Sequence, residues 1–353
     1  MPSSNVTEIG KQIKEGEISS LYYFYGHDTA ALESFTKRLI KRLCPDDAQF
    51  MNYHKMDGKK LDVTELSDAC SALPMFAERV VVSINDLNMD NVSAADTEDI
   101  KTILSDLGET TTVIIYITGE NIYKSNNKYL TDKNKSFLTF CEKHGLACDF
   151  AYKRASDLGR SIASVLAKVG CSITKANAEY LAQLCLCDTG AVMRELEKLS
   201  SYAPGREITR EDIDALCIRR IESDGYALAL NVLRANAGFV FKRVKELDLQ
   251  NYKAHEILGI ISFSLTDLYR AKLARSSGLG WESAAKDFGY PKNREFAIKN
   301  AFNECGPISA ERIRKTLNIL CETDIMLKTR SSGKDGDLLT LEQGLARSMA
   351  LRC

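Results

Sequence analysis

The sequence predicts a multidomain chain of the α/β plus all-α class, with a parallel α/β domain first and helical domains after it. Two apolar runs carry this prediction: residues 79–84 contain three consecutive valines, and residues 111–118 are the most β-like stretch of the chain. Continuous β-branched runs are typical of strands buried on both faces of a parallel sheet. Such runs alternate with amphipathic segments up to about residue 152, where strand signals stop, and this alternation favours a doubly wound sheet.

Each element of the first part has its own signal. An aromatic run at 21–25 predicts the first strand, and Asp28 can cap the helix that follows Gly26. Other helices are expected where apolar residues recur at helical spacing, and two of them end at Gly108 and Gly145. The expected strands are 21–25, 50–56, 79–84, 111–118 and 146–150, and the later helices of this part include 63–73, 100–107 and 137–144.

Beyond Tyr152 the sequence predicts helices alone. Thr209 is a fair cap for a short helix, and Ser223-Asp224-Gly225 predicts a hinge. Long helices are expected at 257–273, 308–328 and 338–349, with a loop at 331–337. The expected domains are an α/β domain at 1–151, a small helical domain at 152–221 and a second helical domain at 222–353.

The composition is that of an ordinary soluble globular protein, with a formal net charge of -1 at pH 7. So small a charge gives no global field that points to nucleic acid or to a membrane surface. No apolar run could span a bilayer and residues 1–26 lack a signal-peptide pattern, so we expect a cytoplasmic protein with reduced thiols. The cysteines and histidines are scattered without a Cys-x-x-Cys pair, so neither a metal site nor a cofactor is expected.

The order of domains suggests the body of an AAA+-type ATPase, which makes the loop after the first strand decisive. A phosphate loop needs Gly-x-x-x-x-Gly-Lys-Ser/Thr, because glycine amides surround the phosphates and the lysine neutralises them. Residues 26–31 read Gly-His-Asp-Thr-Ala-Ala, with an aspartate where a phosphate would lie. Asp86, after the third strand, lacks the acidic neighbour of a Walker B motif. We therefore expect an NTPase-like shape with no catalytic residues.

The segment before the third strand is the strongest candidate for a functional surface. Pro74 ends the preceding helix, so Met75 and Phe76 fall in a helix-to-strand turn. Two large apolar side chains in such a turn are either tucked under the loop or presented to a partner. From these residues alone, an apolar pair beside a strand is more often part of the core.

Several sequence patches, taken in order, resemble the delta subunit of the bacterial DNA polymerase III clamp loader. In the first domain they are 21–26 with the acidic residue that follows, Phe50-Met51-Asn52-Tyr53 with Asp57, and 73–79. Further on they are 178–181, 194–199, 208 with 211–213, 284–286 with 289–291, 324–329 and 341–342. Each motif is soft, but their order and the missing phosphate loop identify the chain as a member of this family over nearly its whole length.

The resemblance implies a non-hydrolysing role in the DNA polymerase III holoenzyme. Family members lack ATPase activity and sit in a pentamer with delta-prime and the ATP-hydrolysing gamma/tau subunits. In that fold, residues 152–221 correspond to a small lid domain and 222–353 to an oligomerising collar. Family members bind the sliding clamp, or beta subunit, and hold its ring open for loading onto primed DNA. Their clamp-binding element corresponds to Met75 and Phe76, with Pro74 setting the exit angle; the family often has leucine in place of Met75.

A weaker second site lies at Tyr290, Lys292 and Arg294. An aromatic ring beside two cations could meet a base and a phosphate of primer-template DNA. The surrounding residues 281–301 resemble a helix-turn-helix, for which a solvated hairpin in the collar is the simpler interpretation. Two alternative functions stay open. One is a helix-turn-helix DNA-binding regulator, which the near-neutral charge disfavours; the other is an NTPase with a non-standard phosphate loop, which the composition of that loop disfavours.

Overall fold

The three central strands of the first domain form where β-branched and aromatic residues are concentrated. The computed structural model describes residues 6–124, 129–217, 221–329 and 333–351. A five-stranded sheet has the order β2-β3-β4-β1-β5, and all its pairings are parallel. Its strands are β1 (Leu21–Tyr25), β2 (Tyr53–Asp57), β3 (Val80–Asn85), β4 (Thr111–Tyr116) and β5 (Leu146–Asp149). The predicted parallel α/β fold is confirmed.

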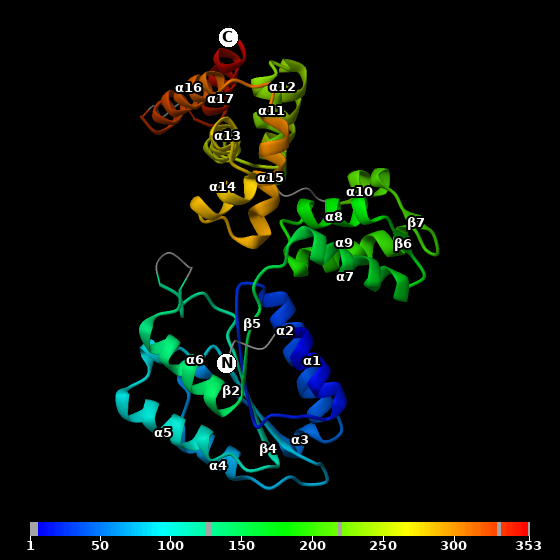
Figure 1. The fold of residues 1–353 in the computed structure, drawn as a ribbon, viewed down its shortest axis with the longest axis vertical. Coiled ribbons are helices and arrows are strands. Elements are labelled where there is room, and N and C mark those ends of the chain that lie inside the picture. Colours follow the sequence, from blue (N-terminus) through cyan, green and yellow to red (C-terminus); the bar gives the residue numbers. More distant parts are fainter. Residues whose placement is uncertain (1–5, 125–128, 218–220, 330–332, 352–353) are drawn as a thin grey trace. The chain divides into compact units, whose positions relative to one another are not determined.

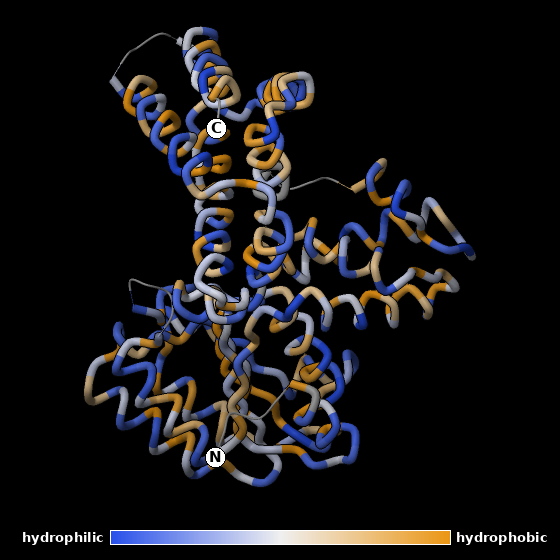
Figure 2. Tube along the Cα trace, turned by 45° about the horizontal axis from the view of Figure 1, so that its top comes forward, coloured by the Kyte–Doolittle hydropathy of each residue, from blue (hydrophilic) through white to orange (hydrophobic). Residues whose placement is uncertain are grey.

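Helices cover both faces of this sheet, which explains why its central strands are apolar throughout. One face carries α1 (Val6–Glu15) and α2 (Thr29–Leu43), and the other carries α4 (Val63–Ser71), α5 (Ala94–Ser105) and α6 (Asp132–His144) (Figure 1). Side chains alternate along β1, so that Tyr22 and Phe24 pack with the first group of helices and Leu21 and Tyr23 with the second. Figure 2 shows hydrophobic residues along the strands and mixed hydropathy along the helices around them.

The start of the second strand differs from the prediction. Residues 50–52 belong to a short helix, α3 (Gln49–Asn52), and β2 begins only at Tyr53. In a strand that began at residue 50, Phe50 and Asn52 would lie on the same face, but Phe50 is 94% exposed and Asn52 is fully buried. The helix α1 had no counterpart in the sequence prediction.

Residues 153–353 form a second compact unit, separate from the unit of residues 1–152. Its helices are α7 (Ala155–Lys168), α8 (Lys175–Leu184), α9 (Thr189–Tyr202), α10 (Arg210–Leu216), α11 (Ile221–Leu233), α12 (Ala237–Leu249), α13 (Ala254–Ser276), α14 (Trp281–Asp287), α15 (Glu295–Glu304), α16 (Ala310–Thr329) and α17 (Gly333–Met349). One hydrophobic core lies among α7 to α10 and another among α11 to α17. The C-terminal helical domain is confirmed, and the division of this unit at residue 221 stays a prediction that the two cores favour.

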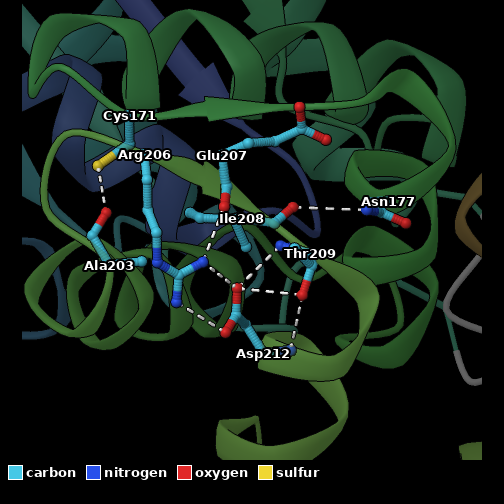
Figure 3. Close-up of polar contacts among 8 residues, drawn as sticks. All are labelled: Cys171, Asn177, Ala203, Arg206, Glu207, Ile208, Thr209 and Asp212. Carbon is cyan, nitrogen blue, oxygen red and sulfur yellow. Dashed lines mark hydrogen bonds and ion pairs between the residues drawn. The ribbon is translucent and has the colours of Figure 1, made fainter.

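A short parallel ladder within this unit was missed from the sequence. β6 (Ser172–Ile173) pairs with β7 (Glu207–Ile208), and two-residue strands leave no periodic signal. Figure 3 shows the polar contacts around β7: Arg206 donates to both carboxylate oxygens of Asp212, at 2.7 and 2.9 Å. Asp212 also accepts a hydrogen bond from the backbone N–H of Thr209, whose hydroxyl accepts one from the N–H of Asp212. This capping box starts α10 and confirms Thr209 as its cap.

Two segments that were predicted to be a hinge and a loop are helical instead. Ser223-Asp224-Gly225 lies inside α11, so the predicted hinge is wrong. A β-carbon at Gly225 would overlap Ile260 of α13, which indicates that this glycine serves close packing of two helices and not a bend. The predicted loop at 331–337 is wrong from Gly333 onward, where α17 begins, and residues 330–332 lie outside the described residues.

We expect Gly145→Ala to destabilise the first domain. Gly145 joins α6 to β5, and a β-carbon there would overlap the backbone carbonyl oxygen of Leu21 in β1. Overpacking of this kind costs about 1–3 kcal/mol. Calorimetry of the full chain should show a lower unfolding midpoint for this variant, whereas Gly108→Ala, where nothing lies within 4 Å of the new β-carbon, should unfold like the wild type. An unchanged midpoint for Gly145→Ala would contradict the packing described.

Candidate functional site

Two segments that are distant in sequence meet at the amino-terminal edge of the sheet. Because β2 and β3 are parallel neighbours with Tyr53 opposite Val81, the residues that precede the two strands also lie side by side. These residues are the helix α3 and the loop 72–79 between α4 and β3. The three predicted residues Pro74, Met75 and Phe76 all lie in this loop.

Large apolar side chains on these two segments are at the surface and not in the core. Phe76 is 98% exposed, Leu73 81% and Met75 49%. On α3, Phe50 is 94% exposed and Met51 49%. Single exposed apolar residues are ordinary, but a group on adjacent segments is the kind of surface that marks partner binding. We call these five residues the apolar patch.

The side chain of Asn52 fixes the backbone of the loop. Asn52 is 0% exposed, and its Oδ1 accepts a hydrogen bond from the N–H of Met75 at 2.7 Å. Its Nδ2 donates to the carbonyl oxygens of Met75, at 2.8 Å, and Ala48, at 2.9 Å. A side-chain amide that bonds to both the N–H and the C=O of one residue takes the place of a neighbouring strand at that residue. Met75 is thus held in place although it belongs to no helix or strand.

Phe76 has a left-handed backbone, with φ of 57°. For a residue with a β-carbon this conformation costs about 1–2 kcal/mol, and it persists where the surrounding structure determines it. Two hydrogen bonds between Asn52 and the preceding residue contribute about 1–3 kcal/mol together. The buried amide therefore stabilises the loop by about as much as the backbone of Phe76 destabilises it.

The opposite, carboxyl-terminal edge of the sheet holds the loop where a nucleotide phosphate would bind. Gly26 has φ of 135°, and a β-carbon there would lie 2.6 Å from backbone atoms of Phe150. The N–H of Asp28 donates to the carbonyl oxygen of Phe150 at 2.9 Å, and the Asp28 carboxylate accepts from the N–H of Ala31 at 3.1 Å. The turn is closed against the end of β5, and a carboxylate occupies the helix N-terminus, where phosphates bind in nucleotide-binding loops.

Asp86, at the Walker B position, is bonded to the chain's own donors. Its Oδ1 accepts hydrogen bonds from the N–H of Thr118 at 2.7 Å, the hydroxyl of Thr118 at 2.9 Å and the N–H of Gly119 at 3.1 Å. The ammonium of Lys59 lies 3.5 Å from Oδ2. Burial opposes ionisation of this carboxyl, but the hydrogen bonds and the lysine outweigh burial and lower its pKa. The carboxylate therefore joins the end of β3 to the segment after β4.

The three residues of the second predicted site are not equivalent. Tyr290 donates its phenolic hydrogen bond to the carboxylate of Asp267, which is buried. Burial, followed by this bond, raises the pKa of Tyr290 to about 12, so the phenol stays a donor. Arg294 lies 3.6 Å from the same carboxylate and 4.0 Å over the ring of Phe263. Lys292, in the short helical turn before α15, is exposed.

Among the residues that the structure describes, no group of three or more His, Cys, Asp or Glu side chains could hold a metal ion. None of the helices in the same part of the chain combines the length and the apolar character needed to cross a membrane.

The fold and the site together define a class of protein. The chain has a parallel α/β domain, with the apolar patch at the amino-terminal edge of its sheet and its own carboxylates at the carboxyl-terminal edge, and this domain is followed by a helical unit. The family model for the DNA polymerase III delta subunit matches residues 22–142, and the model for the C-terminal domain of that subunit matches residues 222–341. The chain belongs to the DNA polymerase III delta subunit family, as the sequence patches indicated.

One sequence and one solved structure from Bacillus subtilis each match nearly the whole chain. The DNA polymerase III subunit delta of strain 168 is 21% identical over 344 residues, which cover 96% of this chain and 95% of the relative. The solved structure of the DNA clamp loader delta protein has a TM-score of 0.64 and 19% identity, covering 98% of this chain and 100% of that one. At this level of identity the structural likeness shows a shared fold.

We expect Asp86→Ala to lower the free energy of unfolding by about 1–3 kcal/mol, because the partly buried donors of Thr118 and Gly119 lose their acceptor. The lowered pKa gives this effect a pH dependence. The contribution of the ionised carboxylate is complete above the unfolded pKa of about 3.9 and is lost as the pH falls through the lower folded value. Urea denaturation at several pH values should show this loss, with the exposed Asp99→Ala as a control. Equal stability of wild type and Asp86→Ala at neutral pH would contradict it.

The closed turn also predicts that the chain does not bind nucleotide. Titration calorimetry of the full chain with millimolar Mg²⁺·ATP should give no saturable heat, because the Asp28 carboxylate already occupies the helix N-terminus and repels phosphate. Saturable binding would revive the interpretation of an NTPase with a non-standard phosphate loop.

Proposed function

We propose that this chain is the clamp-opening delta subunit of a bacterial DNA polymerase III clamp loader and docks on the sliding clamp through the apolar patch. The observation that carries the proposal is the presentation of Phe76: its ring is almost fully exposed, and a hydrogen-bonded neighbour holds its backbone in a costly conformation. By the family resemblance, Met75 and Phe76 correspond to the family's hydrophobic pair, and both lie in the loop that leads into β3.

The size of the patch suits such a role. Removing a Phe or Met side chain from water stabilises a complex by about 1.5–3 kcal/mol, so two anchors supply several kcal/mol, a typical share for the central residues of an interface. Docking alone does not open a ring. A ligand shifts a closed–open equilibrium only if it binds the open form more tightly. Surface next to the patch must therefore make contacts with the clamp that are lost when the ring closes.

The remaining partners follow from membership of a loader. The collar would join this chain to delta-prime and gamma/tau subunits, and primer-template DNA would pass within the assembled ring, in the bacterial cytoplasm. Of the three residues proposed for DNA contact, Lys292 is the one whose exposure suits a phosphate. Tyr290 and Arg294 would have to exchange their contacts with Asp267 for contacts with DNA.

No catalytic step is assigned to the chain. Asp28 lies in the loop that corresponds to the phosphate loop of an NTPase, and Asp86 lies at the Walker B position. Both carboxylates accept hydrogen bonds from backbone N–H groups of the chain itself. The competing proposal of a helix-turn-helix regulator rests on α14 and α15. It requires tight DNA binding by the isolated chain, for which a net charge of -1 gives little support.

We expect Phe76→Ala to weaken binding of the organism's own sliding clamp by roughly tenfold to a hundredfold, the loss that corresponds to one buried aromatic anchor. The double variant Met75→Ala/Phe76→Ala should abolish capture of the clamp in a pull-down. Both variants should unfold like the wild type, since the two side chains are exposed. Leu249→Ala, which truncates an exposed apolar residue of α12, serves as the control. Normal clamp binding by the double variant would refute the proposal.

A further inference from the structure

We propose that Asn52 is a positioning residue that holds Phe76 ready for docking before the partner arrives. This inference rests on the proposed function and assigns part of the docking affinity to a residue that the clamp never touches. It concerns the loop 72–79 in the free chain, where the ring of Phe76 would otherwise be attached to an unsupported segment.

The loop depends on Asn52 because it has few other hydrogen bonds. Within the described residues, 73–79 form no backbone–backbone hydrogen bond outside regular elements. The guanidinium of Arg79 donates to Thr112 at the far end of the segment. The two bonds between Asn52 and the backbone of Met75, 23 residues apart in sequence, are thus the polar contacts that fix the part next to Phe76.

The same residue joins both halves of the apolar patch. Asn52 is the last residue of α3 and follows Phe50 and Met51 directly. Its third hydrogen bond, to the carbonyl oxygen of Ala48, fixes the amide against its own helix. One buried side chain therefore joins the backbone segments that carry Phe50 and Phe76.

The expected loss of clamp affinity depends on how often the loop 72–79 of the free chain adopts the conformation that docks. If the released loop adopts that geometry about one tenth of the time, the apparent affinity falls about tenfold. The left-handed backbone of Phe76 makes a released loop favour other conformations, since residues with a β-carbon rarely adopt positive φ unaided.

The test compares two full-length variants, Asn52→Ala and Asn134→Ala. Asn134 is a matched control: it is also 0% exposed, and its amide bonds to the N–H of Met89 at 3.1 Å and to Asn88 at 2.8 Å, on the α6 side of the sheet. Surface plasmon resonance on immobilised sliding clamp gives the affinity. Hydrogen–deuterium exchange of the free chain, read on peptides that cover 73–79 and on peptides that cover β3, gives the order of the loop.

We expect Asn52→Ala to bind the clamp about tenfold more weakly and to exchange faster at 73–79 but not in β3, while Asn134→Ala binds within about twofold of wild type, inside the usual error of additivity. Equal affinity of Asn52→Ala and wild type, unchanged exchange at 73–79, or an equal loss of affinity in Asn134→Ala would each overturn the inference. Phe76→Ala, measured beside them, separates the two proposals: if it binds normally, the docking role of the patch fails, whatever the exchange of the loop shows.

Discussion

The parallel register of β2 and β3 is the constraint on which the candidate site depends. It brings the residues before the two strands together, so that Asn52, just before β2, reaches Met75, a few residues before β3. Side chains alternate along a strand, and a slip of one residue would exchange the faces of the sheet. The apolar strands buried between two layers of helices oppose such a slip. The sheet core therefore determines where the ring of Phe76 is presented.

The two edges of the sheet have opposite characters. At the carboxyl edge, Asp28 and Asp86 accept hydrogen bonds from the chain's own amides, and the turn at Gly26 is closed on Phe150. At the amino edge, large apolar side chains are left exposed and their backbone is fixed by a buried amide. The first arrangement puts a carboxylate where a phosphate would lie, and the second leaves the surface that we propose for docking. One scaffold thus carries both features, at opposite edges of the same sheet.

Much of the fold was predictable because burial leaves periodic signals. β3 and β4 are apolar on both faces, and Asp28 and Thr209 cap helices by local contacts. Pro74 placed the apolar pair in a loop for a local reason as well. Asn52 belonged to a family-like patch, but its partner is 23 residues away and no spacing rule connects them. The same holds for Tyr290 and its acceptor Asp267. The prediction of a hinge at 223–225 was wrong because a sequence does not distinguish a glycine that permits close helix packing from a glycine that permits bending.

Because the patch is divided between α3 and the loop 72–79, the docking surface that we propose is discontinuous in sequence. A linear peptide copied from the loop would carry Leu73, Met75 and Phe76 but would lack both the amide of Asn52 and the ring of Phe50. Such a peptide would have to lose its conformational freedom on binding, which lowers affinity. An inhibitor that imitates this surface therefore needs a cyclic or otherwise bridged backbone, with the bridge standing where Asn52 meets Met75.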